Sequence, residues 1–79
     1  MASRGQVSLN MEGLPSLRCT IRDISQSGLG LELETEDNVD VPSDTPVLID
    51  GQGFTLDGVI RHCVRWKKGY RIGVELIDP

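Results

Sequence analysis

Aromatic residues are scarce in this chain of 79 residues, where they make up 4% and consist of Phe54, Trp66 and Tyr70. Apolar residues of all kinds reach 38%, so a hydrophobic core has to come from Leu, Ile and Val. A chain of this length forms one domain, close to the lower size limit for a core without cross-links. A small β-barrel suits such a chain, because a closed sheet leaves no exposed edge.

Cysteine and histidine are also rare, since the chain has Cys19, Cys63 and a single histidine, His62. Two cysteines are too few for a disulfide scaffold, and both lie in predicted strands, so we expect buried free thiols. A structural zinc ion needs four ligands, and the carboxylates are not spaced to complete such a set, which predicts no metal site.

Catalytic patterns are missing as well. His62 and Cys63 are neighbours in a predicted strand, so their side chains point to opposite faces and cannot form a catalytic couple with each other. A lone histidine in a strand is more often a packed or surface residue, and no glycine-rich phosphate loop precedes a helix. We therefore expect a protein that is not an enzyme and needs no cofactor.

Long apolar runs are absent, and no run approaches the length of a membrane span. The start of the chain lacks the charged and apolar segments of a signal peptide. These features predict a soluble, cytosol-facing domain that does not itself insert into a membrane.

Positive charge is missing from the middle of the chain, because no Lys or Arg lies between Arg22 and Arg61. The net charge of −4 argues against a general DNA or RNA binder, whose affinity comes mainly from neutralising phosphates. Acidic residues crowd the 32–57 segment. Cations crowd the last two strands and their turn, which form either a solvated face or a rim able to hold a small anion. They are Arg61, Arg65, Lys67, Lys68 and Arg71.

Apolar residues alternate with polar ones along most of the chain, as in half-buried strands. In the first run, Val7, Leu9 and Met11 are expected to face inward. Further runs predict strands at residues 17–22, 29–34, 46–50, 54–65 and 70–76. No segment has a helical period. The predicted fold class is therefore all-β, a six-stranded antiparallel barrel at residues 6–79, preceded by a flexible N-terminal segment at residues 1–5.

Gly58 interrupts the fifth predicted strand, where the inward phase changes from Phe54 and Leu56 to Val59. A glycine at such a break predicts a bulge or a barrel corner.

A polar turn, Asp23-Ile24-Ser25-Gln26-Ser27-Gly28, joins the second and third predicted strands. Alternation puts Asp23 on the same face as Leu17, Cys19 and Ile21, at the rim where the apolar stripe ends. Asp, Ser and Gly are the residues of any tight turn, and they can equally hold a ligand through short polar groups. Both interpretations stay open on spacing alone.

The hexapeptide resembles the D/N-x-S-x-x-G signature of PilZ domains, and it lies between the second and third strands as in that family. The end of the chain is similar too, where Trp66 and a short turn precede a closing strand at residues 70–76. The resemblance implies a six-stranded barrel that binds cyclic di-GMP, a bacterial second messenger with two guanines and two phosphates. Hosts of such domains include bacterial cellulose synthases and other exopolysaccharide machinery, which implies an excised regulatory module acting on a neighbouring domain or partner protein.

The same resemblance implies the site residues. Asp23 and Ser25 would hydrogen-bond a guanine edge, and Gly28 would let the backbone approach the ligand. An upstream R-x-x-x-R motif grips phosphates in the family, and here only Arg4 precedes the first strand. The other arginine has been cut away, lies upstream in the full protein, or never existed in this member. Ligand binding is expected to order the N-terminal segment.

Two further features have open interpretations. Trp66 either seals the barrel end, which its rarity favours, or offers a stacking face to a base. Arg65 and Arg71 either lie on a solvated rim or add phosphate contacts. The alternative function is a PilZ-like barrel without nucleotide binding that acts as a protein interaction module, which the missing arginine pair and the acidic 32–57 segment favour. A small barrel whose turn merely mimics the motif is a third option.

Overall fold

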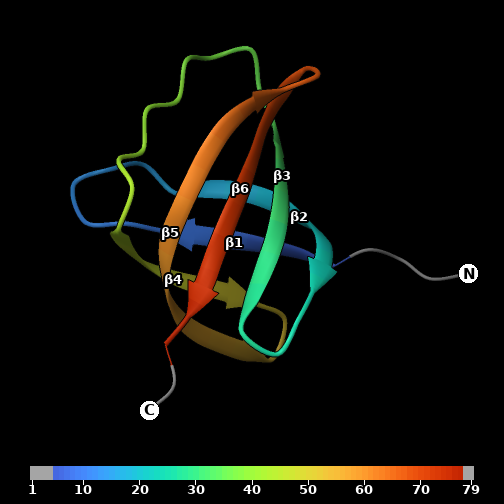
Figure 1. Cartoon of the computed structure of the whole chain (residues 1–79), viewed down its shortest axis with the longest axis vertical. Helices are drawn as coiled ribbons and strands as arrows, with labels where there is room; N and C mark the ends of the chain where they lie inside the picture. The colour runs from blue at the N-terminus through green and yellow to red at the C-terminus, as the bar shows by residue number, and fades with distance from the viewer. Residues whose placement is uncertain (1–4, 78–79) are drawn as a thin grey trace, which may run out of the picture.

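Six antiparallel strands form a closed barrel in the computed structural model of the chain, which describes residues 5–77 (Figure 1). Neighbouring strands follow the order β1-β2-β3-β6-β5-β4, and β1 pairs with β4 to close the barrel. The predicted all-β, six-stranded antiparallel barrel is thus confirmed. The strands are β1 Gln6–Asn10, β2 Leu17–Ile24, β3 Gly28–Glu34, β4 Thr45–Gly51, β5 Phe54–Trp66 and β6 Gly69–Leu76.

The start of the chain enters the barrel beside β2. Of the predicted N-terminal segment, only Gly5 lies within the described residues, and its carbonyl oxygen accepts a hydrogen bond of 2.9 Å from the Ile21 amide. Gly5, the first described residue and the one that follows Arg4, is therefore held beside Ile21, two positions from Asp23 in β2.

Alternating apolar side chains fill the barrel interior, as the periodicity predicts. Leu9, Ile49 and Ile60 are completely buried, and no polar or charged side chain among residues 5–77 is buried. The inward face predicted for β1 is confirmed, because Val7, Leu9 and Met11 are all buried. The buried core consists of Val7, Leu9, Met11, Cys19, Leu29, Leu31, Leu33, Val47, Ile49, Ile60, Tyr70, Ile72 and Val74.

Both cysteines are free thiols, as predicted, although Cys19 is buried and Cys63 is only half-buried. Burial raises the pKa of the Cys19 thiol to about 12, and the charge of Cys63 adds to the shift. Burial, followed by the charge of Asp40, also raises the pKa of Cys63. Since the thiolate is the reactive form of cysteine, both side chains are held in their unreactive state.

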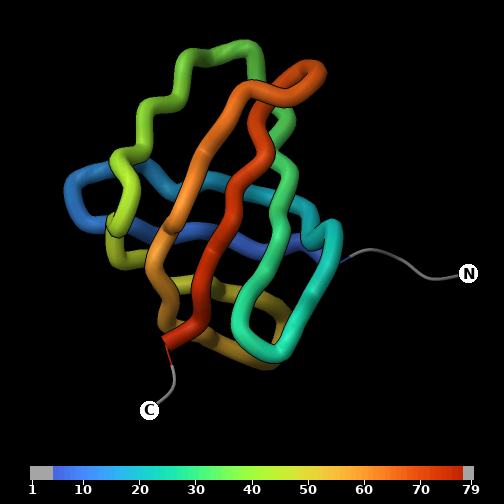
Figure 2. Tube along the Cα trace, viewed as in Figure 1, coloured from blue at the N-terminus to red at the C-terminus, as the bar shows by residue number. Residues whose placement is uncertain are grey.

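The connection between β3 and β4 covers one end of the barrel and then runs beside β5 (Figure 2). Val39 and Val41 pack against the core, and the Val39 amide donates a hydrogen bond of 2.9 Å to the Tyr70 hydroxyl. Trp66, in contrast, lies on the outer surface with 38% of its area exposed. The expectation that Trp66 seals the barrel end is therefore wrong, because Tyr70 and this connection close it.

Replacing Tyr70 with phenylalanine is expected to lower the free energy of unfolding by about 1–2 kcal/mol. The variant loses the hydroxyl that accepts from the Val39 amide and from Arg65 Nη1, each at 2.9 Å. Urea denaturation followed by circular dichroism measures the change. A loss below about 0.3 kcal/mol, small against the usual worth of one hydrogen bond, would show that water replaces the hydroxyl without cost.

Two β-bulges change which face the following side chains occupy. Ile21 pairs with Leu31 while Asp23 pairs with Gly30, so β2 holds one extra residue at Arg22. An extra residue in one strand reverses the alternation beyond it. Asp23 therefore lies on the outer face, and the prediction that it continues the apolar stripe of β2 is wrong.

The second bulge lies in β5 at Arg61, because Ile60 pairs with Val74 and His62 pairs with Gly73. Pairing with β4 runs without interruption through Gly58, which faces Val47, so the bulge predicted at Gly58 is wrong in position. Gly58 is itself an inward residue, and an added Cβ there would come within 2.6 Å of Val74 Cγ1. The apparent change of phase in the sequence is therefore the missing side chain of an inward glycine.

Candidate functional site

The turn after β2 is closed by hydrogen bonds between Ser25 and Gly28. The Ser25 amide donates to the Gly28 carbonyl at 2.9 Å, and the Gly28 amide donates to Ser25 Oγ at 3.1 Å. The Ser27 carbonyl accepts a bond of 2.8 Å from the Leu76 amide, which fixes the turn to β6. Ser25 and Gly28 therefore hold the corner in shape as well as lining it.

Gly28 is required by its neighbour on β6. An added Cβ at this position would overlap the carbonyl oxygen of Val74, which belongs to the backbone and cannot swing away. The close approach that glycine allows here is thus made by β6, and it exists without any ligand.

Four residues form a row across the outer face of the barrel, where Asp23 pairs with Gly30, Gly30 with Gly73, and Gly73 with His62. An added Cβ on Gly30 would lie 2.7 Å from Asp23 Oδ1, and one on Gly73 would overlap the His62 ring. The carboxylate and the imidazole therefore lie over the two glycines from opposite sides. Both bulges are needed for this arrangement, because each turns one of the two side chains outward.

An open hollow of about 530 Å³ lies over this row and is lined by Asp23, Ser25, Gly28, Arg61 and His62, among others. This volume falls within the range of about 300–1,000 Å³ that is usual for ligand sites. The structure thus brings together three of the predicted site residues, whereas Arg4 lies outside the described residues.

The cations that line the hollow are Arg61 and Arg71. Arg71 stacks on Trp66, with its guanidinium carbon 4.9 Å from the ring centroid. Arg65 does not line the hollow; its Nη1 donates to the Tyr70 hydroxyl at the barrel end. Of the two arginines considered as phosphate contacts, the structure therefore places only Arg71 at this site.

A second and larger hollow of about 1030 Å³ lies near the turn between β5 and β6. Its lining sets the cations Arg18, Lys67 and Lys68 beside the carboxylates Glu32 and Glu34. None of the residues of the polar corner lines it. The first hollow is therefore the better candidate for a ligand that the polar corner binds.

A family model of the PilZ domain matches residues 1–79. The chain belongs to the PilZ family. No curated protein matches the chain. PilZ domains are known as cyclic di-GMP receptors and act as regulatory binding modules rather than enzymes, so the predicted family is confirmed and a regulatory role is supported.

Two negative findings concern the described part of this PilZ domain. Between residues 5 and 77 no three His, Cys, Asp or Glu side chains gather as a metal site requires. The same residues form no helix of the length and apolar character needed to cross a membrane.

His62 and Gly73 of this PilZ domain are not predicted as site residues from the sequence. Gly30 and Gly73 stand at outward positions of neighbouring strands, and a glycine in a strand interior signals close approach by another group. The sequence contains that signal. It does not show the partner of Gly73, because placing His62 over Gly73 depends on the bulge at Arg61.

Proposed function

We propose that this PilZ domain binds cyclic di-GMP in the hollow over Gly30 and Gly73 and couples the bound state to a neighbouring domain or partner protein. The observation that carries the proposal is the outward position of Asp23, whose carboxylate lines the hollow together with Ser25 and Gly28. A guanine edge presents N–H groups, and a carboxylate is an acceptor able to bind two of them. Binding shifts the population of conformations and involves no chemical step.

His62 is the second contact in this proposal. Its ring covers Gly73 on one side, and the residue is exposed to solvent on the other. An aromatic ring in this setting offers a face on which a guanine can stack. Asp23 would then hydrogen-bond the edge of a guanine while His62 stacks on a guanine face. The two residues contact either the same base or the two different bases of one ligand.

Replacing His62 with alanine is expected to weaken cyclic di-GMP binding by about 5- to 100-fold, since stacking of a base on an aromatic side chain is worth about 1–3 kcal/mol. Isothermal titration calorimetry measures the change. The matched control is His62→Phe, which keeps a ring over Gly73 and is expected to bind within about three-fold of the original chain, a small part of the stacking energy. Equal affinity of the alanine variant would remove His62 from the site.

Arg4 is the proposed phosphate contact at the entry of the chain. It follows from the family motif, and it is supported by the position of Gly5, whose carbonyl pairs with the amide of Ile21 close to Asp23. We expect the domain to lie in the cytoplasm, because its proposed ligand is a bacterial second messenger. Control of exopolysaccharide synthesis or motility is the proposed process.

A further inference from the structure

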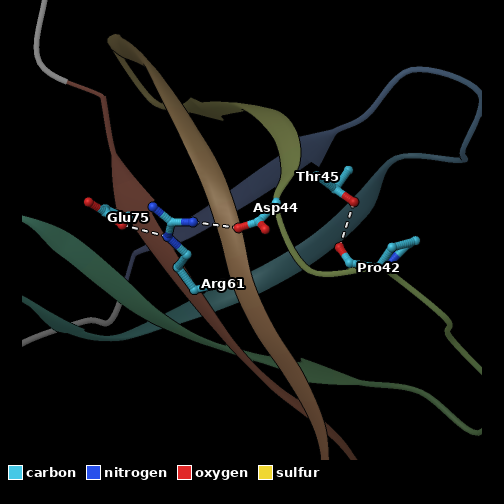
Figure 3. Close-up of polar contacts among 5 residues, drawn as sticks. All are labelled: Pro42, Asp44, Thr45, Arg61 and Glu75. Atoms are coloured by element: carbon cyan, nitrogen blue, oxygen red, sulfur yellow. Dashed lines mark hydrogen bonds and ion pairs between the residues drawn. The ribbon is translucent and has the colours of Figure 1, made fainter.

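Arg61 connects the hollow to the segment that leads into β4 (Figure 3). Its Nε donates to Glu75 Oε1 on β6 at 2.5 Å, and its Nη1 bonds Asp44 Oδ1. Arg61 and Glu75 line the hollow, whereas Asp44 does not. One guanidinium thus joins the proposed ligand surface to a carboxylate outside it.

Asp44 is the last residue before β4 and has an unusual backbone conformation. Its φ of 66° lies in the left-handed region, which a residue with a side chain adopts at a cost of about 1 kcal/mol. Its amide donates to the Ile60 carbonyl at 2.6 Å, directly before Arg61 in the chain. Asp44 marks the junction between the 35–44 connection and β4. Two contacts with β5 hold this junction, one to the backbone of Ile60 and one to the side chain of Arg61.

The ion pairs of Arg61 are open to exchange. The side chains of Arg61, Asp44 and Glu75 are 50%, 69% and 52% exposed. Hydrogen bonds to Glu75 and then to Asp44 raise the pKa of Arg61, so the group is fully charged. Exposed ion pairs contribute little stability, while a phosphate matches the planar guanidinium fork with two oxygens at once.

We propose that Arg61 binds a phosphate of the ligand in the hollow. In the free protein Asp44 and Glu75 hold the Arg61 side chain, and the bound phosphate replaces Asp44 as its partner. This inference rests on the proposed cyclic di-GMP binding. Release of Asp44 removes one of its two contacts with β5 and loosens the acidic connection at residues 35–44. The ligand signal is thereby passed from the barrel surface to an exposed segment that a partner can contact.

The test is a double-mutant cycle of Arg61→Gln and Asp44→Asn, with affinity for cyclic di-GMP measured by calorimetry. Asparagine tolerates the left-handed conformation, so Asp44→Asn removes the charge without straining the junction. We expect R61Q to weaken binding about ten-fold and D44N to tighten it about three-fold, from the usual worth of charge-assisted hydrogen bonds and exposed ion pairs. D44N should have no effect once Arg61 is glutamine, because it acts through that side chain.

The control is Asp37→Asn, which removes the same charge from the same connection, and it is expected to change affinity less than two-fold. Wild-type affinity of R61Q, or equal tightening by D44N in both backgrounds, would overturn the inference while leaving the proposed function intact. If the unmodified chain does not bind cyclic di-GMP, the proposed function and this inference are both refuted.

Amide hydrogen exchange gives a second readout, measured first without the ligand and then with it. Amide hydrogen exchange at Asp44 is expected to be faster in R61Q than in the unmodified chain, and cyclic di-GMP should speed the same amide in the unmodified chain. Unchanged exchange in R61Q would show that Arg61 does not hold the junction and would contradict the coupling.

Discussion

Replacing Asp23 with alanine is expected to weaken cyclic di-GMP binding by about 100-fold or more. The variant loses an acceptor for two guanine N–H groups, and a hydrogen bond to a charged group is worth about 1.5–3 kcal/mol. Isothermal titration calorimetry at fixed ionic strength measures the loss. Asparagine at the same position keeps one acceptor oxygen and is expected to lose about ten-fold, the equivalent of one such bond.

Loss of binding in this variant can be separated from loss of folding. Asp23 is exposed, and its carboxylate contacts the outer face of Gly30 rather than the core. Thermal denaturation of Asp23→Ala should therefore match that of the unmodified chain within about 2 °C, as usual for a surface substitution. A variant that folds normally and binds with unchanged affinity would place the ligand elsewhere.

Replacing Gly28 with alanine is expected to lower the free energy of unfolding by about 2 kcal/mol in the absence of any ligand, the usual cost of overpacking. The added methyl group would overlap the carbonyl oxygen of Val74, so β3 and β6 would have to separate. Urea denaturation of the ligand-free protein measures the loss. The family motif assigns Gly28 the role of letting the ligand approach the backbone. This experiment tests a different role, the close approach of β6 to β3.

Gly53→Asn provides the control for the loss of a glycine. Gly53 has a φ of 82° in the turn between β4 and β5, and an added Cβ would meet nothing within 4 Å. Asparagine accepts this conformation at low cost, so less than about 1 kcal/mol should be lost. A smaller loss for Gly28→Ala than for Gly53→Asn would contradict the steric explanation.

The barrel was predictable because its physical signal is simple. Residues such as Val7, Leu9 and Ile72 recur at every second position, and each turns out to be buried. Turn residues separate these runs at spacings that suit antiparallel neighbours. The six strands and the inward faces of the strands without a bulge therefore follow from periodicity, and the corner motif supplies the family.

The position of the site was less predictable, because it depends on two single-residue insertions in the pairing. Neither Arg22 nor Arg61 differs in type from an ordinary strand residue, and alternation continued through Arg22 gives the wrong face for Asp23. Strand register is a property of the paired backbone, and it is set by neighbours distant in sequence. His62 is a surface residue, one of the two outcomes expected for it, and its place over Gly73 depends on the bulge at Arg61.

Pairs of residues from different strands were likewise invisible in the sequence. Arg61 and Asp44 are separated by β4, the following turn and the first part of β5, and the register in which Thr45 faces Ile60 brings them together. The sequence shows that cations crowd the end of the chain. Their division between the hollow, with Arg61 and Arg71, and the barrel end, with Arg65, required the structure.

The most direct test of the proposed site is a titration of the ¹⁵N-labelled chain with cyclic di-GMP, followed by amide chemical shifts. The largest changes are expected at Ser25, Gly28, Gly30 and Gly73, whose amides lie in or beside the hollow. Changes confined to Lys67 and its neighbours would place the ligand in the second hollow. No change at all would contradict nucleotide binding and favour the alternative role as a protein interaction module.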